Sequence, residues 1–181
     1  QDVLILEYLQ NGKYREAQTY FEKKIAATKK KSKNRYTGIE VLNLMLNYEI
    51  EQAEEKAIRV KCAVEAYHCP VDETELCIII GNLFDNAIEA VKDLPDEQRQ
   101  IDFSIQNPNG IFRIEMSNPY EDERRKVEHH YLTTKKENTE MHGLGLMSVQ
   151  KIVEKYDGLM EISDTDNVFK VIVIFFVRGN D

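Results

Sequence analysis

The chain has 181 residues, of which 42% are hydrophobic and 31% are charged, and its formal net charge at pH 7 is −8. This length suits one full-sized domain with a small appendage, and the composition is that of an ordinary globular protein. The negative charge argues against nucleic acid as the main partner, because contacts to phosphates need clustered lysine and arginine.

Neither the apolar runs nor the cysteines indicate a membrane span or a disulfide framework. No apolar stretch approaches the ~20 residues that span a bilayer. Since the chain begins with glutamine inside an apolar pattern, we interpret it as a fragment of a longer protein. Cys62, Cys69 and Cys77 lack Cys-x-x-Cys spacing, which indicates free thiols in a reducing compartment rather than a metal site.

The first 36 residues predict two short helices. The first occupies residues 2–10 and ends at the turn Asn11-Gly12, and the second occupies residues 13–30, with apolar side chains on one face. Such a hairpin cannot bury its apolar surface alone. It either dimerises with its copy or packs on its own domain, and the sequence leaves both possibilities open.

The next elements are a helix over residues 38–57, a strand over residues 59–67 and a central helix over residues 72–91. Asp72 and Glu75 have the spacing of a capping box at the start of the central helix. At 100° per residue, seven apolar residues of this helix share one broad arc, which predicts its core face: Leu76, Ile79, Ile80, Leu83, Phe84, Ala87 and Val91.

A narrow polar stripe follows that core face. It is formed by Asn82, Asn86, Glu89 and Asp93, with Asp85 at its edge. Carboxamide oxygens can ligate a hard cation such as Mg²⁺. Taken alone, two asparagines one turn apart also fit an ordinary solvated helix face.

The rest of the chain predicts a hairpin, a long polar segment, one more helix and two strands. Residues 101–105 and 111–116 pair across the turn at residues 107–110, and residues 119–142 are a candidate lid because they lack an apolar pattern. The last helix is predicted near residues 146–156. Two strands follow, at residues 159–162 and 168–177, around a turn at residues 164–167. This order predicts an α/β fold, a two-layer α/β sandwich with a mixed five-stranded sheet covered on one face by helices and preceded by the short helical hairpin.

Glycines at the start of the last helix predict a phosphate site. In His142-Gly143-Leu144-Gly145-Leu146, the glycines let a phosphate approach backbone N–H groups at the positive end of the helix dipole. An ordinary loop-to-helix junction is the alternative. The dinucleotide fingerprint and the Walker lysine are both missing.

The two motifs together resemble the ATP-binding (Bergerat) fold shared by gyrase-type ATPases and sensor histidine kinases. Asn82-Leu-Phe-Asp-Asn86-Ala resembles the N box of the kinases, and Gly143-Leu-Gly145-Leu resembles their second glycine box. Gyrase-type members carry glutamate at the position of Asn82, so the histidine kinase branch fits best. Within that branch, residues 85–90 (Asp-Asn-Ala-Ile-Glu-Ala) and the shortened segment between the two boxes resemble the Agr-type peptide-sensing (quorum-sensing) kinases. This resemblance implies that the chain is the cytoplasmic part of a membrane-anchored protein. Residues 37–181 would be the catalytic ATP-binding domain, and residues 1–36 part of the dimerisation helices.

The resemblance implies roles for individual residues. Asn86 would ligate Mg²⁺ beside ATP, and Asn82, Asp85 and Glu89 would lie at the same site. Asn82 cannot serve as the water base, because a carboxamide is not basic enough. The two glycines would bring their N–H groups to the phosphates. Other contacts to ATP are implied at Leu144 and Leu146, which pack inward, and in the lid at Thr134 and Lys135.

The sequence departs from the wider family beside the adenine. Asn118 stands where an aspartate would accept a hydrogen bond from the adenine amine, and the glycines of the first glycine box are absent. His129 and His130 do not lie in the sequence setting of the phosphoacceptor histidine. The resemblance therefore places that histidine upstream of Gln1.

The resemblance, together with the departures from it, implies two alternative functions. The first is a kinase domain that binds Mg·ATP, transfers the γ-phosphoryl group to a histidine and passes it on to a cognate response regulator, within a homodimer of the full-length kinase. Residues 1–181 alone would not phosphorylate themselves. The second is a degenerate nucleotide-binding or dimerisation module without kinase activity, which the missing first glycine box favours.

Overall fold

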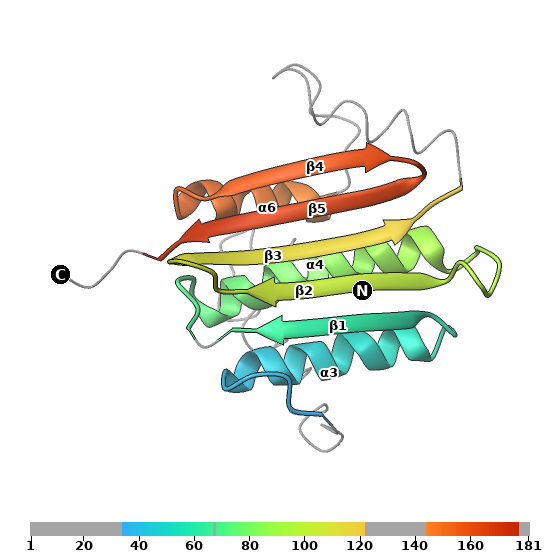
Figure 1. Cartoon of the computed structure of the whole chain (residues 1–181), viewed down its shortest axis with the longest axis horizontal. Coiled ribbons are helices and arrows are strands. Elements are labelled where there is room, and N and C mark those ends of the chain that lie inside the picture. The colour runs from blue at the N-terminus through green and yellow to red at the C-terminus, as the bar shows by residue number, and fades with distance from the viewer. Residues whose placement is uncertain (1–33, 67, 122–143, 178–181) are drawn as a thin grey trace.

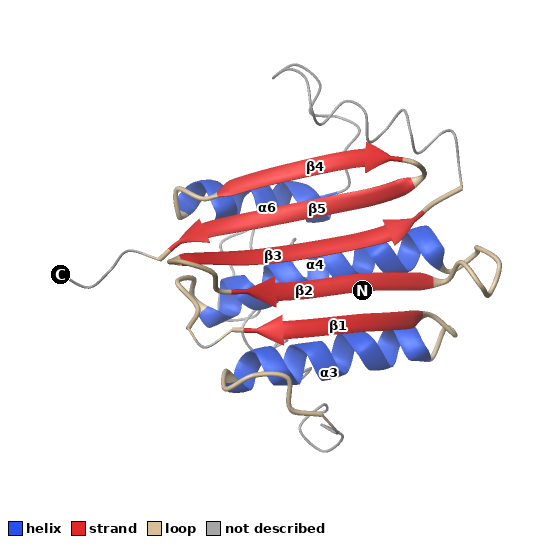
Figure 2. Ribbon diagram, in the orientation of Figure 1, coloured by secondary structure: helices blue, strands red, loops and turns tan. Residues whose placement is uncertain are grey.

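The structure, a computed structural model, describes residues 34–66, 68–121 and 144–177. Its single five-stranded sheet has the order β1-β2-β3-β5-β4, in which β1 and β2 are parallel and the other neighbours are antiparallel. The strands are β1 (Arg59–Glu65), β2 (Gln100–Gln106), β3 (Ile111–Pro119), β4 (Leu159–Thr165) and β5 (Val168–Phe176). The described helices are α3 (Glu40–Glu54), α4 (Glu73–Val91) and α6 (Leu144–Lys155). All three lie on one side of the sheet (Figure 1, Figure 2).

Strand alternation explains why the helices cover that face. On β3, every second side chain from Phe112 to Asn118 is buried, and on β5 the same holds from Phe169 to Phe175. Successive side chains of a strand point to opposite faces, so these residues form one apolar surface that the helices bury. The two-layer α/β sandwich predicted from the sequence is therefore confirmed for the described residues.

The central helix α4 has the predicted core face. All seven residues of the predicted arc are buried, with at most 2% of each exposed. Cys77, Ile78 and Ile88 are buried as well. The reason is that α4 contacts three neighbours. The helices α3 and α6 pack against it and the sheet strands β2 and β3 cover another face, so more than one face of α4 is enclosed.

The ends of several elements differ from the sequence prediction. α3 is shorter than predicted, β1 ends at Glu65, and β4 continues to Thr165. Asp166 and Asn167 alone make the turn between β4 and β5, both with positive φ, as in the two-residue hairpins that match strand twist. The turn of the β2–β3 hairpin is confirmed, with positive φ at Asn109 and Gly110.

Within the described ranges, no helix is both long and apolar enough to cross a membrane. The predicted hairpin lies almost wholly outside these ranges, and only its last residues, 34–36, are described.

Candidate functional site

The two predicted motifs meet where α4 contacts the start of α6. Asn82 in the middle of α4 lies against Gly145 in the first turn of α6. Glu75 near the start of α4 bonds Lys155 at the end of α6, so the two helices run antiparallel. A Cβ added at Gly145 would lie only 2.6 Å from Asn82 Oδ1 and 3.4 Å from Asn82 Cγ. Any side chain at position 145 would therefore force Asn82 to shift, so glycine allows the close approach, and Gly145 lies inside the helix rather than in a preceding loop.

Asn82 is held in place by its own helix. Its Nδ2 donates to the carbonyl oxygen of Ile78 one turn back, at 2.7 Å. With the donor occupied, the Oδ1 atom is directed at Gly145. Because an amide cannot take a proton from water, Asn82 orders this contact rather than acting as a base.

Asn86 lies one turn further along α4, about 6 Å away at 1.5 Å per residue. Its side-chain Nδ2 is buried and has no hydrogen-bond partner among the described residues. Leaving a buried donor unpaired costs about 1–3 kcal/mol. A bound group with oxygen acceptors would remove that cost, so this atom marks a place where a ligand fits.

Asn118 lies at the end of β3, on the face that the helices cover. It is 2% exposed and lies directly opposite Phe169 on β5. Its Nδ2 donates to the carbonyl oxygen of Pro119 at 3.0 Å, and no hydrogen bond involving its Oδ1 is found in the described part of the chain. That oxygen is an uncharged acceptor beside an aromatic ring, a combination that suits the amine of a purine.

The strand end beyond Asn118 is fixed by a tyrosine. Tyr120 is buried, its hydroxyl donates to Asp164 on β4, and its backbone N–H donates to the carbonyl oxygen of Asn167. Burial and the bond to Asp164 raise the pKa of Tyr120 to about 12, so the hydroxyl stays a donor. The predicted lid over residues 119–142 therefore began too early, since Pro119 belongs to β3 and Tyr120 is anchored.

The predicted site residues Asp85 and Glu89 lie on the same helix as the two asparagines, three residues after Asn82 and Asn86 respectively. Asp85 and Glu89 are exposed on α4, and Glu89 forms an ion pair with Lys92 at 2.8 Å. Asp93 lies beyond the end of α4, so the predicted polar stripe ends at Glu89. Leu146 is buried and anchors the start of α6. The predicted contacts Thr134, Lys135 and Gly143 lie outside the described residues, and Leu144 is described only as the first residue of α6.

The donor set fits Mg·ATP better than a metal held by protein alone. Among the described residues, no group of three or more His, Cys, Asp or Glu side chains could hold a metal. Mg²⁺ needs only one or two protein oxygens when phosphates and waters supply the rest. The unpartnered Nδ2 of Asn86 can donate to a phosphate oxygen, and the Oδ1 of the same carboxamide can supply one protein oxygen to the metal. With the glycine at the start of α6, this is compatible with that arrangement.

A hydrogen-bond network ties the other ends of α4 and α6 together. The Tyr156 hydroxyl accepts from the Asp72 N–H at 3.2 Å and donates to Glu75 Oε2 at 2.6 Å, while Lys155 bonds both oxygens of Glu75 at 2.8 and 2.9 Å. Burial and the bond to Glu75 raise the pKa of Tyr156, which keeps it a donor at neutral pH. The predicted capping box is therefore confirmed in one half and wrong in the other. Asp72 is the N-cap of α4 and its Oδ1 accepts from the Thr74 N–H, but the Asp72 N–H donates to Tyr156 rather than to Glu75.

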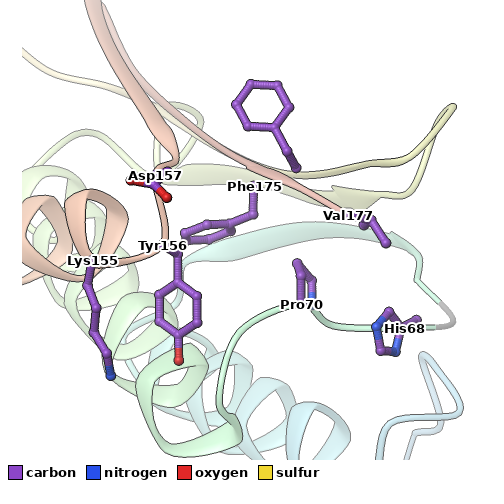
Figure 3. Close-up of a pocket in the computed structure, with 8 residues that line it drawn as sticks. His68, Pro70, Lys155, Tyr156, Asp157, Phe175 and Val177 are labelled. Atoms are coloured by element: carbon purple, nitrogen blue, oxygen red, sulfur yellow. The ribbon is translucent and has the colours of Figure 1, made fainter. Parts of the chain in front are cut away.

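A cavity of about 400 Å³ lies beside this network (Figure 3). Figure 3 shows Tyr156 and Phe175 on one side of it and His68, Pro70 and Val177 on the other. The polar atoms of Lys155 and Tyr156 already have partners in Glu75 and Asp72. The cavity lies at the end of α4 away from Asn86, so it is separate from the candidate site.

We expect Tyr156→Phe to lower the free energy of unfolding by about 1–2 kcal/mol, because Asp72 N–H and Glu75 both lose a partner while the edge-to-face contact with Phe175 stays. Lys155→Ala should cost less, because its ammonium is exposed and solvent screens its ion pair with Glu75. Urea unfolding of both variants checks this order of effects. Equal losses would contradict the role assigned to the hydroxyl.

The thiols take no part in this chemistry. Burial raises the pKa of Cys62 to about 11, and burial, followed by the charge of Glu73, raises that of Cys77 to about 12. Burial also raises the pKa of Cys69. Protonated thiols are poor nucleophiles and poor metal ligands. All three cysteines are free.

Several solved structures share this fold. The catalytic domain of the histidine kinase ThkA aligns with a TM-score of 0.58 at 17% identity, over 75% of this chain and 92% of that one. The mycobacterial sensor histidine kinase MprB aligns with a TM-score of 0.53 at 17% identity, over 78% and 96%. Full-length ShkA, solved in complex with AMPPNP, aligns with a TM-score of 0.56 at 17% identity, over 78% of this chain and 30% of ShkA. At these identities the likeness shows a common fold.

Sequence comparison identifies the family. A probable C4-dicarboxylate sensor kinase of Halalkalibacterium halodurans is 26% identical over 106 residues, which cover 58% of this chain and 20% of the relative. The chain thus spans about a fifth of the length of that curated relative. Residues 71–175, from just before α4 to the end of β5, match the family model described as the GHKL domain. The chain therefore belongs to the GHKL domain family and has the fold of the histidine kinase catalytic domains.

Proposed function

We propose that this chain is the catalytic ATP-binding domain of a two-component sensor histidine kinase. It binds Mg·ATP beside the middle of α4 and the start of α6, and it transfers the γ-phosphoryl group to a histidine outside residues 1–181. The observation that carries this proposal is the buried, unpartnered Nδ2 of Asn86, one turn from the contact between Asn82 and Gly145. That ShkA was solved with AMPPNP supports a nucleotide as the ligand.

The proposal assigns a role to each residue of the site. The carboxamide of Asn86 supplies the oxygen ligand for the metal and donates its N–H to a phosphate oxygen. The N–H groups of Gly143 and Gly145 donate hydrogen bonds to the phosphate oxygens at the positive end of the α6 dipole. Asn118 Oδ1 accepts from the adenine amine, and Thr134 and Lys135 close over the phosphates. Mg²⁺, when bound, neutralises the charge that develops on the transferred group.

The wider signalling role rests on the resemblance and on the relative. The acceptor histidine would pass its phosphoryl group to the aspartate of a cognate response regulator, and the full-length kinase would work as a membrane-anchored homodimer. The N box and the shortened segment between the boxes favour the Agr-type peptide-sensing branch. The curated relative is a probable C4-dicarboxylate sensor kinase, a different kind of signal from a peptide.

A module without kinase activity is the second candidate. The absence of the first glycine box after Asn118 favours it, because those glycines would make the backbone beside the adenine conformationally flexible. Such a module would bind nucleotide weakly and act by dimerising or docking a partner.

We expect residues 1–181 to bind ATP without labelling themselves. Incubation with ATP labelled at the γ-phosphate should give no acid-labile phosphoprotein, and release of ADP should be slow because Asn82 replaces a water base. Extending the natural sequence upstream by about three helical turns, ~11 residues, should restore labelling on a histidine. Robust labelling of residues 1–181 themselves, at His129 or His130 for example, would contradict this assignment.

A further inference from the structure

Two asparagines on α3 bond the backbone just before the helix. Asn43 Oδ1 accepts from the N–H groups of Tyr36 at 2.7 Å and Thr37 at 3.0 Å, and Asn43 Nδ2 donates to the Thr37 carbonyl oxygen at 2.7 Å. One turn later, Asn47 Nδ2 donates to the Asn34 carbonyl oxygen at 2.8 Å, and Asn47 Oδ1 accepts from the Asn34 N–H at 3.1 Å. Five backbone groups of residues 34–37 are thus bonded by two side chains.

These bonds depend on the carboxamide group. An asparagine side chain carries the donor and the acceptor of a peptide group, so Asn47 pairs with Asn34 as a neighbouring strand would. Aspartate would offer acceptors only, and serine has no carboxamide to pair with a peptide group. Asparagine is a poor helix former, costing about 0.5 kcal/mol per residue relative to alanine, so two in one helix weaken it unless they serve another purpose.

Helix capping does not explain why Asn43 and Asn47 are asparagines. The N-cap of α3 is Ile39, which makes no side-chain cap hydrogen bond. Both Asn43 and Thr37 are buried, each with 9% exposed, and Thr37 Oγ1 donates to the carbonyl oxygen of Ala66 at 2.6 Å, just beyond β1. Residues 34–37 are therefore fixed to both α3 and the edge of the sheet.

We propose that Asn43 and Asn47 form a joint that fixes the direction in which the chain N-terminal to Asn34 leaves the domain, and that both are positioning residues for phosphoryl transfer. This inference rests on the proposed function, in which the acceptor histidine is covalently connected through this point. A rigid joint limits the positions that the acceptor can take relative to the γ-phosphate. Loss of alignment by about 1 Å can cost about 100-fold in rate, so the joint affects transfer and leaves nucleotide binding unchanged.

The test compares Asn47→Ala with Gln52→Ala in the natural full-length protein. Gln52 is a matched control, because it is a carboxamide on the same helix whose side chain bonds, within the described residues, only the exposed Glu55. We expect Asn47→Ala to slow histidine phosphorylation about tenfold or more with unchanged affinity for Mg·AMPPNP, and Gln52→Ala to change neither. Hydrogen exchange should show that the Asn34 N–H loses its protection in Asn47→Ala alone.

A second variant keeps the test decisive if Asn47→Ala unfolds. Two glycines inserted between residues 33 and 34 leave α3 and its asparagines untouched but remove the rigid connection, and they should slow transfer in the same way. Normal transfer in either variant, with the joint shown to be open or interrupted, would overturn the proposal. Failure of the unaltered protein to bind nucleotide would instead refute the proposed function, and the exchange at Asn34 would still report on the joint itself.

Discussion

Asn86→Ala is expected to weaken the binding of Mg·ATP about 100-fold while leaving the protein at least as stable as before. The loss of affinity, about 3 kcal/mol, is the size expected when a metal ligand or its immediate support is removed. The stability should rise by about 1 kcal/mol, because the substitution deletes a buried donor that has no partner and introduces a better helix former. A substitution that lowers affinity for Mg·ATP but raises the free energy of unfolding is typical of a residue that binds a ligand at a cost in stability.

Asp93→Ala is the control for this substitution. Asp93 was predicted to lie on the same polar stripe, but it is exposed and lies beyond the end of α4. Calorimetric titration of both variants, each with and without Mg²⁺, makes the comparison. Equal losses of affinity in the two variants, or a destabilised Asn86→Ala that binds Mg·ATP normally, would refute the role of Asn86.

Gly145→Ala is expected to lower both stability and affinity. By helix propensity alone, this change in α6 would stabilise by about 1 kcal/mol. The new Cβ would instead lie 2.6 Å from Asn82 Oδ1, and Asn82 must then shift, which disturbs its 2.7 Å bond to Ile78. We therefore expect a net loss of about 1–3 kcal/mol in the free energy of unfolding, together with weaker nucleotide binding.

Two further variants separate the clash from other effects. Gly38→Ala should be neutral or slightly stabilising, because nothing lies within 4 Å of a Cβ added there. In the double variant Asn82→Ala/Gly145→Ala the clash is gone, so stability should recover more than additivity allows while affinity does not. A Gly145→Ala single variant as stable as the native chain would contradict the close packing of α4 on α6.

The fold could be predicted because its elements are strongly patterned. Seven apolar residues on one arc of residues 72–91 define α4, and the alternation along β3 and β5 defines the covered face of the sheet. Element ends were less predictable. Asp164 and Thr165 have the composition of a turn, yet they belong to β4, because pairing with β5 outweighs local propensity.

The site was predictable where one side chain acts within a local motif and not where distant segments meet. The spacing of Asn82 and Asn86 and the glycine at position 145 were visible in the sequence. No local pattern shows that Tyr156 would take the backbone bond expected of Glu75, since 81 residues separate the two side chains. Asn43 and Asn47 have the same spacing as Asn82 and Asn86. Asparagines one turn apart in a helix were therefore a sequence signal for the contact with residues 34–37 as well.

The most direct test of the central claim is a titration of isotope-labelled residues 1–181 with Mg·AMPPNP, followed by amide chemical shifts. The account predicts Mg²⁺-dependent binding, with the largest shifts at Asn86, Gly145 and Asn118 and small ones around the cavity at His68. It also predicts that the same titration of Asn86→Ala loses most of its dependence on Mg²⁺. Shifts centred on the cavity at His68, or no saturable binding at millimolar nucleotide, would contradict a nucleotide site beside α4 and α6.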